Sequence, residues 1–207
     1  MNIALYISGR SKLYDKWLIK QLQNNKEHKI DIFSSFNEDE NKDFNNLINP
    51  VCVKWEKYTL PGKWSNISHK HESTKPQNMC SMYYNNKRSF ELIEEHMKNN
   101  NIKYDLIVKY RPDIMREDLP NFFITENNEV YTPDEHIFGW PGINDMIAFG
   151  NFESMKVYSN MYDCIDEYIN NNVLFHPETM LRYHLDNKGI TIKNFKYKYD
   201  LDKERLI

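Results

Sequence analysis

The chain has 207 residues, of which 40% are hydrophobic and 14% aromatic, so it can bury the core of one sizeable α/β domain. Its formal net charge of −3 provides no basic field, which argues against a nucleic-acid partner. No apolar run approaches the roughly 20 residues of a membrane span, and the opening MNIALYISGR lacks the pattern of a signal peptide.

The cysteines are Cys52, Cys80 and Cys164, which are far apart in the sequence and form no CxxC pair. An odd number of isolated cysteines favours free thiols in a reducing compartment over a disulfide framework or a zinc site. We therefore expect a cytoplasmic protein.

The first quarter of the chain alternates predicted strands and helices. Strands are expected at 3–7, 28–36 and 50–55, where short runs of branched apolar residues are bounded by polar turns. A helix is expected at 12–23 from its helical apolar spacing, and a short acidic helix at 37–48. This alternation predicts a mostly parallel sheet with helices on its faces.

Residues 56–77 interrupt the alternation. The segment EKYTLPGKWSNISHKHESTKPQ is rich in polar residues and has no clear period. A loop of this length in a compact domain is often a lid or binding loop. The alternative is a disordered surface insertion.

Further helices are predicted from apolar residues at helical spacing. They cover 78–100, 151–169 in two pieces, and 176–189, where Gly189 closes the helix. The longest of them, 78–100, carries a stripe of methionine and aromatic residues that we assign mainly to the core.

Further strands are predicted in the second half. The continuous apolar run at 104–111 is typical of a central parallel strand. Residues 129–133 are expected to form a short edge strand, 143–150 another strand, and 190–199 the last one.

The domain organisation is expected to be simple, because the sequence shows no internal repeat and no linker. We treat 1–207 as a single domain, in which 190–207 is the final strand with the C-terminal tail. The charged end KYKYDLDKERLI would also suit a connector to other domains of a larger chain.

Ser8-Gly9-Arg10 follows the first predicted strand. In parallel α/β sheets, ligands bind beyond the carboxyl ends of the strands. A glycine there lets backbone N–H groups approach an anion at the start of the next helix, and Arg10 adds a forked donor suited to phosphate. The alternative is an ordinary turn that needs a glycine. The chain has neither GxGxxG nor GxxxxGK[ST], which argues against a Rossmann dinucleotide site and a P-loop.

Arg111-Pro112-Asp113 follows the predicted central strand. The proline restricts its own backbone and that of Arg111, so the two charged side chains are held in defined directions. A carboxylate held there can bind a hard divalent cation that bridges phosphates, and Arg111 can contact a phosphate or sugar oxygen. The alternative is that Asp113 only caps a turn.

Two later positions could also carry chemistry. Asp145 opens the strand of GINDMIAFG, where a carboxylate can act as general base for a sugar hydroxyl or can cap a turn. Glu178 suits the first turn of a helix, where the dipole favours an acid. His176 or His184 could be a late metal ligand, although a lone histidine is more often structural.

Five segments together resemble a known family. They are IALYISGR, DIFSSFN, SMYYNNKRSFELIE, YDLIVKYRPDI and NDMIAFGNFESMKVY, in this order. The chain resembles the GT-A-type nucleotide-sugar glycosyltransferases of bacterial polysaccharide clusters and large DNA viruses, over most of residues 1–185. The resemblance implies a GT-A-like (Rossmann-like), mostly parallel central sheet with helices on both faces. If the source is viral, the location would be the host cytoplasm.

The resemblance also implies a nucleotide-sugar donor and a Mn²⁺ or Mg²⁺ ion. Ser8, Gly9 and Arg10 match the nucleotide-side turn of the family. The family's metal motif is typically Asp-X-Asp, and Arg111 stands where the first acid is expected, whereas Asp113 matches the second.

Lys87 on the preceding helix is a further candidate for the diphosphate, or a solvated helix charge. The implied reaction is metal-assisted transfer of a sugar, from a UDP-sugar by preference, to a glycan hydroxyl. Asp145 is the candidate base. The alternative is a non-catalytic nucleotide-sugar or glycan-binding domain with a degenerate Asp-X-Asp site. A phosphotransfer enzyme or hydrolase of another α/β family would need a nucleophile or phosphate loop that the sequence does not show.

Overall fold

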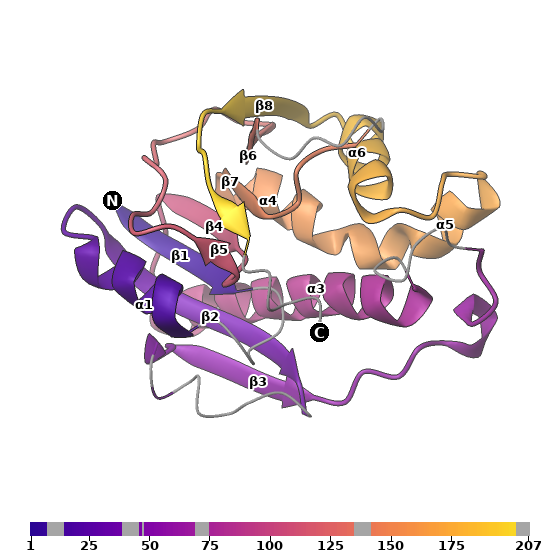
Figure 1. The fold of residues 1–207 in the computed structure, drawn as a ribbon, viewed down its shortest axis with the longest axis horizontal. Helices are drawn as coiled ribbons and strands as arrows, with labels where there is room; N and C mark the ends of the chain where they lie inside the picture. The colour runs from indigo at the N-terminus through magenta and orange to yellow at the C-terminus, as the bar shows by residue number, and fades with distance from the viewer. Residues whose placement is uncertain (8–14, 39–45, 47, 69–74, 135–141, 202–207) are drawn as a thin grey trace.

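A computed structural model describes residues 1–7, 15–38, 46, 48–68, 75–134 and 142–201 (Figure 1). One seven-stranded sheet runs through the molecule in the order β3-β2-β1-β4-β7-β6-β8. Its strands are β1 (Asn2–Ile7), β2 (Lys29–Asn37), β3 (Cys52–Glu56), β4 (Leu106–Tyr110), β6 (Glu129–Pro133), β7 (Ile147–Gly150) and β8 (Thr191–Phe195). The described residues form a single α/β domain.

The sheet is mostly parallel, as predicted. β1 lies parallel to β2 and to β4, β2 lies parallel to β3, and β6 lies parallel to β8. β7 alone runs antiparallel to both of its neighbours, β4 and β6. A second, two-stranded sheet pairs β5 (Ile114–Met115) with β9 (Asp200–Leu201).

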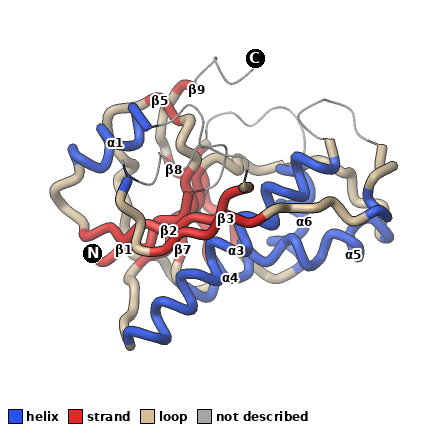
Figure 2. The backbone as a smooth tube through the Cα atoms, turned by 90° about the horizontal axis from the view of Figure 1, so that it is seen from below, coloured by secondary structure: helices blue, strands red, loops and turns tan. Residues whose placement is uncertain are grey.

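Helices cover both faces of the large sheet (Figure 2). α1 and the β5–β9 pair lie on one face, and α3 and α4 lie on the other. The helices are α1 (Asp15–Asn24), α3 (Pro76–Asn100), α4 (Phe152–Ser159), α5 (Ile165–Asn170) and α6 (Pro177–Asn187), with 3-10 turns η2 (Gly62–Trp64) and η4 (Asn160–Cys164). None of the helices in the described part of the chain is long and apolar enough to cross a membrane.

Each face of the sheet has its own apolar core. Along β1, Ala4 and Tyr6 join the cluster on the α3 face, whereas Ile3, Leu5 and Ile7 join the cluster on the α1 face. This division follows from the strand geometry, which sends successive side chains to opposite faces. A strand covered on both faces reads as a continuous apolar run, which is why β1 and β4 could be recognised in the sequence.

α3 begins two residues before the predicted start at 78 and ends at Asn100, as predicted. Pro76 occupies the first turn, where its missing N–H has no helical partner to lose. Asn101 ends the helix in the left-handed conformation, with φ of 50°. The hydroxyl of Ser89 accepts a hydrogen bond of 2.8 Å from the backbone N–H of Ser35, which ties α3 to β2.

Three strand predictions need correction. The strand expected at 143–150 is shorter, since β7 begins only at Ile147. The strand expected at 129–133 is confirmed as β6, but its expected place at the edge of the sheet is wrong, because β6 is paired on both sides, with β7 and β8. The terminal Pro133 is compatible with this inner position, because a proline at the last position removes only one donor from the ladder. The last strand, expected at 190–199, ends at Phe195, since Tyr197 and Tyr199 turn into the core on the α1 face.

Most of the acidic helix expected at 37–48 falls on residues 39–45 and 47, outside the described part. The segment 57–68 packs against the protein rather than standing away from it. Trp64 is 5% exposed, and its indole N–H donates to Asp166 at 2.7 Å. Residues 69–74 lie outside the description.

His184 gives a prediction on pH dependence. It is 1% exposed, with Nδ1 2.6 Å from the Tyr168 hydroxyl and Nε2 2.7 Å from the carbonyl oxygen of Val157. Burial lowers the pKa of His184 below its ordinary value of 6.5. The imidazole of His184 therefore takes up a proton near pH 6.5 in the unfolded chain, but only at a lower pH in the folded protein. Its stabilising contribution is complete above that pH and is lost as the pH falls through the folded-state pKa.

We expect the thermal unfolding midpoint to decrease as the pH is lowered from about 7 to about 5. The decrease should be less steep in His184→Gln than in the wild type. Differential scanning calorimetry over this range measures the slope. His96→Gln, which removes a half-buried imidazole from α3, is the matched control for the loss of one histidine. Equal slopes for His184→Gln and the wild type would contradict the assignment.

Candidate functional site

The strands that precede the two motifs singled out in the sequence end side by side at one edge of the sheet. β1 and β4 are adjacent and parallel, and their last residues, Ile7 and Tyr110, are paired. From β1 the chain adds β2 and β3 on one side, and then β4 on the other. In open α/β sheets, ligands bind beyond the carboxyl ends of strands at such a reversal. Ser8, Gly9 and Arg10 themselves lie outside the described residues.

Arg111 and Asp113 form a forked ion pair directly after β4. Arg111 Nε lies 3.0 Å from Asp113 Oδ1, and Nη2 lies 2.6 Å from Oδ2. The side chains are 14% and 3% exposed. Two parallel charge-assisted hydrogen bonds fix the relative orientation of the groups. Both carboxylate oxygens of Asp113 therefore already face a positive charge, which bears directly on metal binding.

Residues 144–146 hold the end of β4 from the other side. The backbone N–H of Arg111 donates to the carbonyl oxygen of Met146 at 3.1 Å. Asn144 Oδ1 accepts from the Met146 N–H at 2.8 Å, a local turn typical of asparagine. Its Nδ2 donates to the hydroxyl of Tyr199 at 2.7 Å, so the C-terminal tail also contributes to the site.

Asp145 is buried on the same loop. It is 5% exposed, and its main-chain carbonyl accepts a hydrogen bond from the ammonium of Lys109, which is fully buried in β4. Burial, with the negative charge of Asp145 as a smaller cause, raises the pKa of Tyr83. The same two effects, together with the neighbouring Tyr6, raise the pKa of Tyr158. Asp145 thus lies among buried tyrosines that remain neutral, in a low-dielectric environment that strengthens any interaction it makes.

The first turn of α6 closes the site against the loop before β7. The backbone N–H of Ile143 donates to the carbonyl oxygen of Glu178 at 3.3 Å. Gly142 is required by this close approach, since a Cβ at that position would lie 2.8 Å from Glu178 Cβ. His176 Nε2 lies 3.0 Å from the Glu178 carboxylate, and the Tyr83 hydroxyl donates to the carbonyl oxygen of Pro177 at 2.8 Å.

The remaining candidates have other partners. The Lys87 ammonium lies 2.6 and 2.7 Å from the carboxylate oxygens of Asp163 on η4, so contact with a diphosphate would require this ion pair to open. Both ring nitrogens of His184 are engaged in the core, which fits the structural alternative rather than metal binding.

Lys109 and Tyr199 belong to the site but were not singled out in the sequence. Lys109 did carry a signal, because a charged residue inside a fully buried strand is rare unless it is paired. Tyr199 carried none, since the tail is far from Asn144 in sequence and its position depends on the fold.

The fit of a divalent cation can be judged from the donors present. In the part of the chain that the structure describes, no group of three or more His, Cys, Asp or Glu side chains is placed to hold a metal ion. Asp113 is a suitable oxygen ligand, but its oxygens are bonded to Arg111. These residues do not by themselves make a metal site. An ion would need Asp113 to release Arg111, with further oxygens from a ligand.

No protein-family model matches the chain. No curated protein matches it either. The GT-A resemblance therefore rests on the order of the sequence motifs.

Proposed function

We propose that the protein is a glycosyltransferase that moves a sugar from a nucleotide diphosphate sugar to a hydroxyl of a glycan acceptor. A UDP-sugar is the favoured donor. The observation that supports the proposal is the parallel pairing of β1 with β4, in which Ile7 pairs with Tyr110, so that the strands preceding the two sequence motifs end at the same edge of the sheet. A mostly parallel sheet with helices on both faces is also what the motif resemblance implies.

In the proposed reaction, the acceptor oxygen bonds to the anomeric carbon as the bond to the diphosphate breaks. The nucleoside diphosphate leaves with the bonding electron pair, and Asp145 takes the proton of the acceptor hydroxyl. The side chain of Arg111 is 14% exposed, and its guanidinium can turn from Asp113 toward the leaving phosphate. Stabilising that developing charge is the main task of such a site.

Lys109 has a separate role in this proposal. It holds the carbonyl of Asp145 from within β4 and so fixes the backbone that carries the base. A bound Mn²⁺ or Mg²⁺ would supply further positive charge to the diphosphate. Both oxygens of Asp113 are bonded to Arg111, so the proposed reaction uses the protein's own side chains.

A non-catalytic nucleotide-sugar or glycan-binding domain is the second candidate. The Arg111–Asp113 ion pair favours it, because an arginine stands in place of the first acid of the metal motif and neutralises the second. The two candidates make the same prediction for donor binding and differ in product formation.

Donor binding is tested by thermal shift with UDP- and GDP-sugars, with and without Mn²⁺. At about 100 times its Kd, a ligand of the folded state adds about 2.7 kcal/mol, which raises the midpoint by roughly 5–10 °C in a chain of this size. We expect this shift with a UDP-sugar, and a much smaller one in Arg111→Lys, which keeps a positive partner for Asp113 but loses the fork.

Arg182→Lys is the matched control, because Arg182 pairs with Asp186 on the exposed side of α6. It should respond to the donor as the wild type does. Binding without product in a following transfer assay would favour the second candidate. No shift with any nucleotide sugar would overturn both.

A further inference from the structure

The tail that follows β8 runs beside the chain that leaves the candidate site. Its strand β9, at Asp200–Leu201, pairs antiparallel with β5, at Ile114–Met115. β5 begins at the residue after Asp113, and Tyr199 is the residue before β9. This pairing therefore places Tyr199 next to the residues that follow the central strand, although it comes from the end of the sequence.

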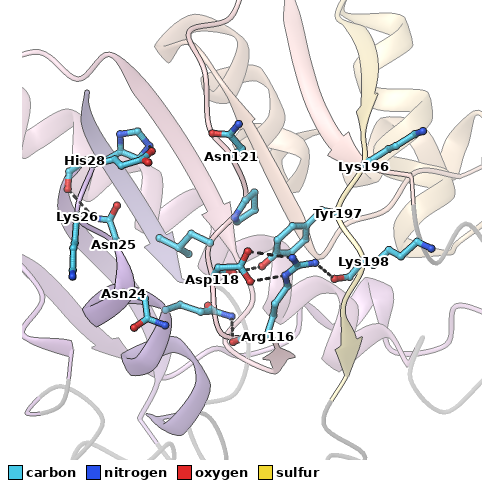
Figure 3. A pocket seen from close by; sticks show the side chains of 14 residues that line it. Asn24, Asn25, Lys26, His28, Arg116, Asp118, Asn121, Lys196, Tyr197 and Lys198 are labelled. Atoms are coloured by element: carbon cyan, nitrogen blue, oxygen red, sulfur yellow. Dashed lines mark hydrogen bonds and ion pairs between the residues drawn. The ribbon is translucent and has the colours of Figure 1, made fainter.

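The tail is also fixed on the other side of Tyr199. At the pocket between the end of α1 and the tail, Figure 3 shows Arg116 bonded both to the Asp118 carboxylate and to the main chain of Lys198. The Tyr197 hydroxyl donates to the carbonyl oxygen of Asp118 at 2.6 Å. Because the tail is held before and after Tyr199, the loss of the Tyr199 hydroxyl alone should leave its course unchanged.

The side chain of Tyr199 ends at the loop that carries Asp145. It is 7% exposed, and its hydroxyl accepts a hydrogen bond of 2.7 Å from Asn144 Nδ2. Asn144 Oδ1 accepts in turn from the N–H of Met146 at 2.8 Å. The amide of Asn144 thus joins the tail to the backbone on the far side of Asp145. Buried polar networks of this kind make the groups that they join more rigid.

The same loop is tied to the Arg111–Asp113 ion pair. The carbonyl oxygen of Met146 accepts from the N–H of Arg111 at 3.1 Å. Burial is the main cause that raises the pKa of Tyr199 above its ordinary value of 10. The charges of Asp145, Arg111 and Asp113 are among the smaller causes. The hydroxyl of Tyr199 therefore stays neutral at physiological pH and lies within electrostatic range of all three candidate residues.

We propose that Tyr199 is a positioning residue of the candidate site. Through the side-chain amide of Asn144 it fixes the loop 144–146, and so holds the Asp145 carboxylate in place beside the ion pair that follows β4. Its part in catalysis rests on the proposed transferase function, in which Asp145 takes the proton of the acceptor hydroxyl. A displacement of about 1 Å in such a group can cost about 100-fold in rate.

Tyr199→Phe separates the hydroxyl from the ring, which packs in the core on the α1 face. The first readout needs no substrate and is hydrogen exchange, followed by NMR, at the backbone amide of Met146. We expect this amide to exchange about tenfold faster or more in the variant, because the Asn144 side chain that accepts its hydrogen bond has lost an anchor. The amides of the β5–β9 pair should keep their wild-type rates.

The second readout is sugar transfer, measured below the unfolding midpoint of each variant. We expect kcat to fall about 10- to 100-fold in Tyr199→Phe while the KM for the donor is unchanged, since the hydroxyl holds the loop of the base. A purely structural role of the hydroxyl would lower the unfolding midpoint and leave the kcat of the folded protein unchanged.

Two further variants show whether the effect passes through Asn144. Tyr197→Phe removes the other tail hydroxyl, which is bonded to Asp118 instead, and should keep the wild-type kcat and exchange rate at Met146. In an Asn144→Ala background the partner of the Tyr199 hydroxyl is gone. Adding Tyr199→Phe to it should therefore change kcat and the exchange rate little, as expected of two residues that act as a unit.

Three results would overturn the proposal. Wild-type exchange at Met146 in Tyr199→Phe would show that the tail does not fix the loop, and faster exchange with an unchanged kcat would show that the reaction does not depend on this anchor. Equal losses in Tyr197→Phe would assign the effect to the packing of the whole tail. If the wild type transfers no sugar from any donor, the proposed function fails, and the exchange at Met146 alone decides whether Tyr199 anchors the loop.

Discussion

Asp145→Asn is expected to reduce sugar transfer by about 10²- to 10⁴-fold, because the amide cannot take the proton of the acceptor hydroxyl. Donor binding should be unchanged. The substitution is nearly isosteric, and Lys109 contacts the main-chain carbonyl of Asp145 rather than its carboxylate. The loop that carries the residue therefore keeps its anchor in the variant.

A radiolabelled-donor transfer assay measures the rate, and the thermal shift described above measures donor binding. Asp134→Asn, an exposed carboxylate just after β6, is the control and should transfer at the wild-type rate. A full-rate Asp145→Asn variant would remove Asp145 from the chemistry. Parallel loss of binding and transfer would instead assign it to structure or donor contact.

Phe149→Ala is expected to lower the free energy of unfolding by about 3–5 kcal/mol. The Phe149 ring is fully buried in β7 and stacks on its cross-strand neighbour Tyr131, with ring centres 5.3 Å apart and planes 9° apart. The rings of Phe122 and Phe195 lie 5.4 and 5.1 Å away. Removing the ring leaves a cavity where the large sheet meets the tail.

Urea unfolding measures the effect as a lower midpoint with an unchanged slope. Phe123→Ala is the matched control, because Phe123 touches the same aromatic group but is 41% exposed. It should lose clearly less stability than Phe149→Ala. Equal losses would show that the aromatic group is not organised around Phe149. Since domains are stable by only about 5–15 kcal/mol, the loss at Phe149 would be a large share of the total.

The parts of the candidate site differ in how far the sequence could reveal them. Arg111, Asp113 and Asp145 could be selected because each follows or opens a recognisable buried strand. The ion pair between Arg111 and Asp113 could not be foreseen, since residues two apart in a turn can point together or apart. The contact of Tyr199 with Asn144 was not foreseen at all, because the two residues lie 55 positions apart in the chain.

The corrections have a common cause. Residues 129–133 were recognised as a strand, but their place between β7 and β8 depends on partners that come later in the chain. The antiparallel direction of β7 and the turn of the tail after Phe195 were likewise hidden. The place of β6, the direction of β7 and the course of the tail are all decided by which apolar surfaces are buried together.

The sequence by itself determined where most of the strands and helices form and that the sheet is mostly parallel, because the spacing of apolar residues is a local property of the chain. It also determined which charged residues follow the buried strands. Only the tertiary structure decided the order of the strands, the pairing of Asp113 with Arg111, and the crossing of the tail over the α1 face. These depend on contacts between residues distant in sequence, where burial and pairing of whole surfaces select one arrangement among many that the local pattern allows.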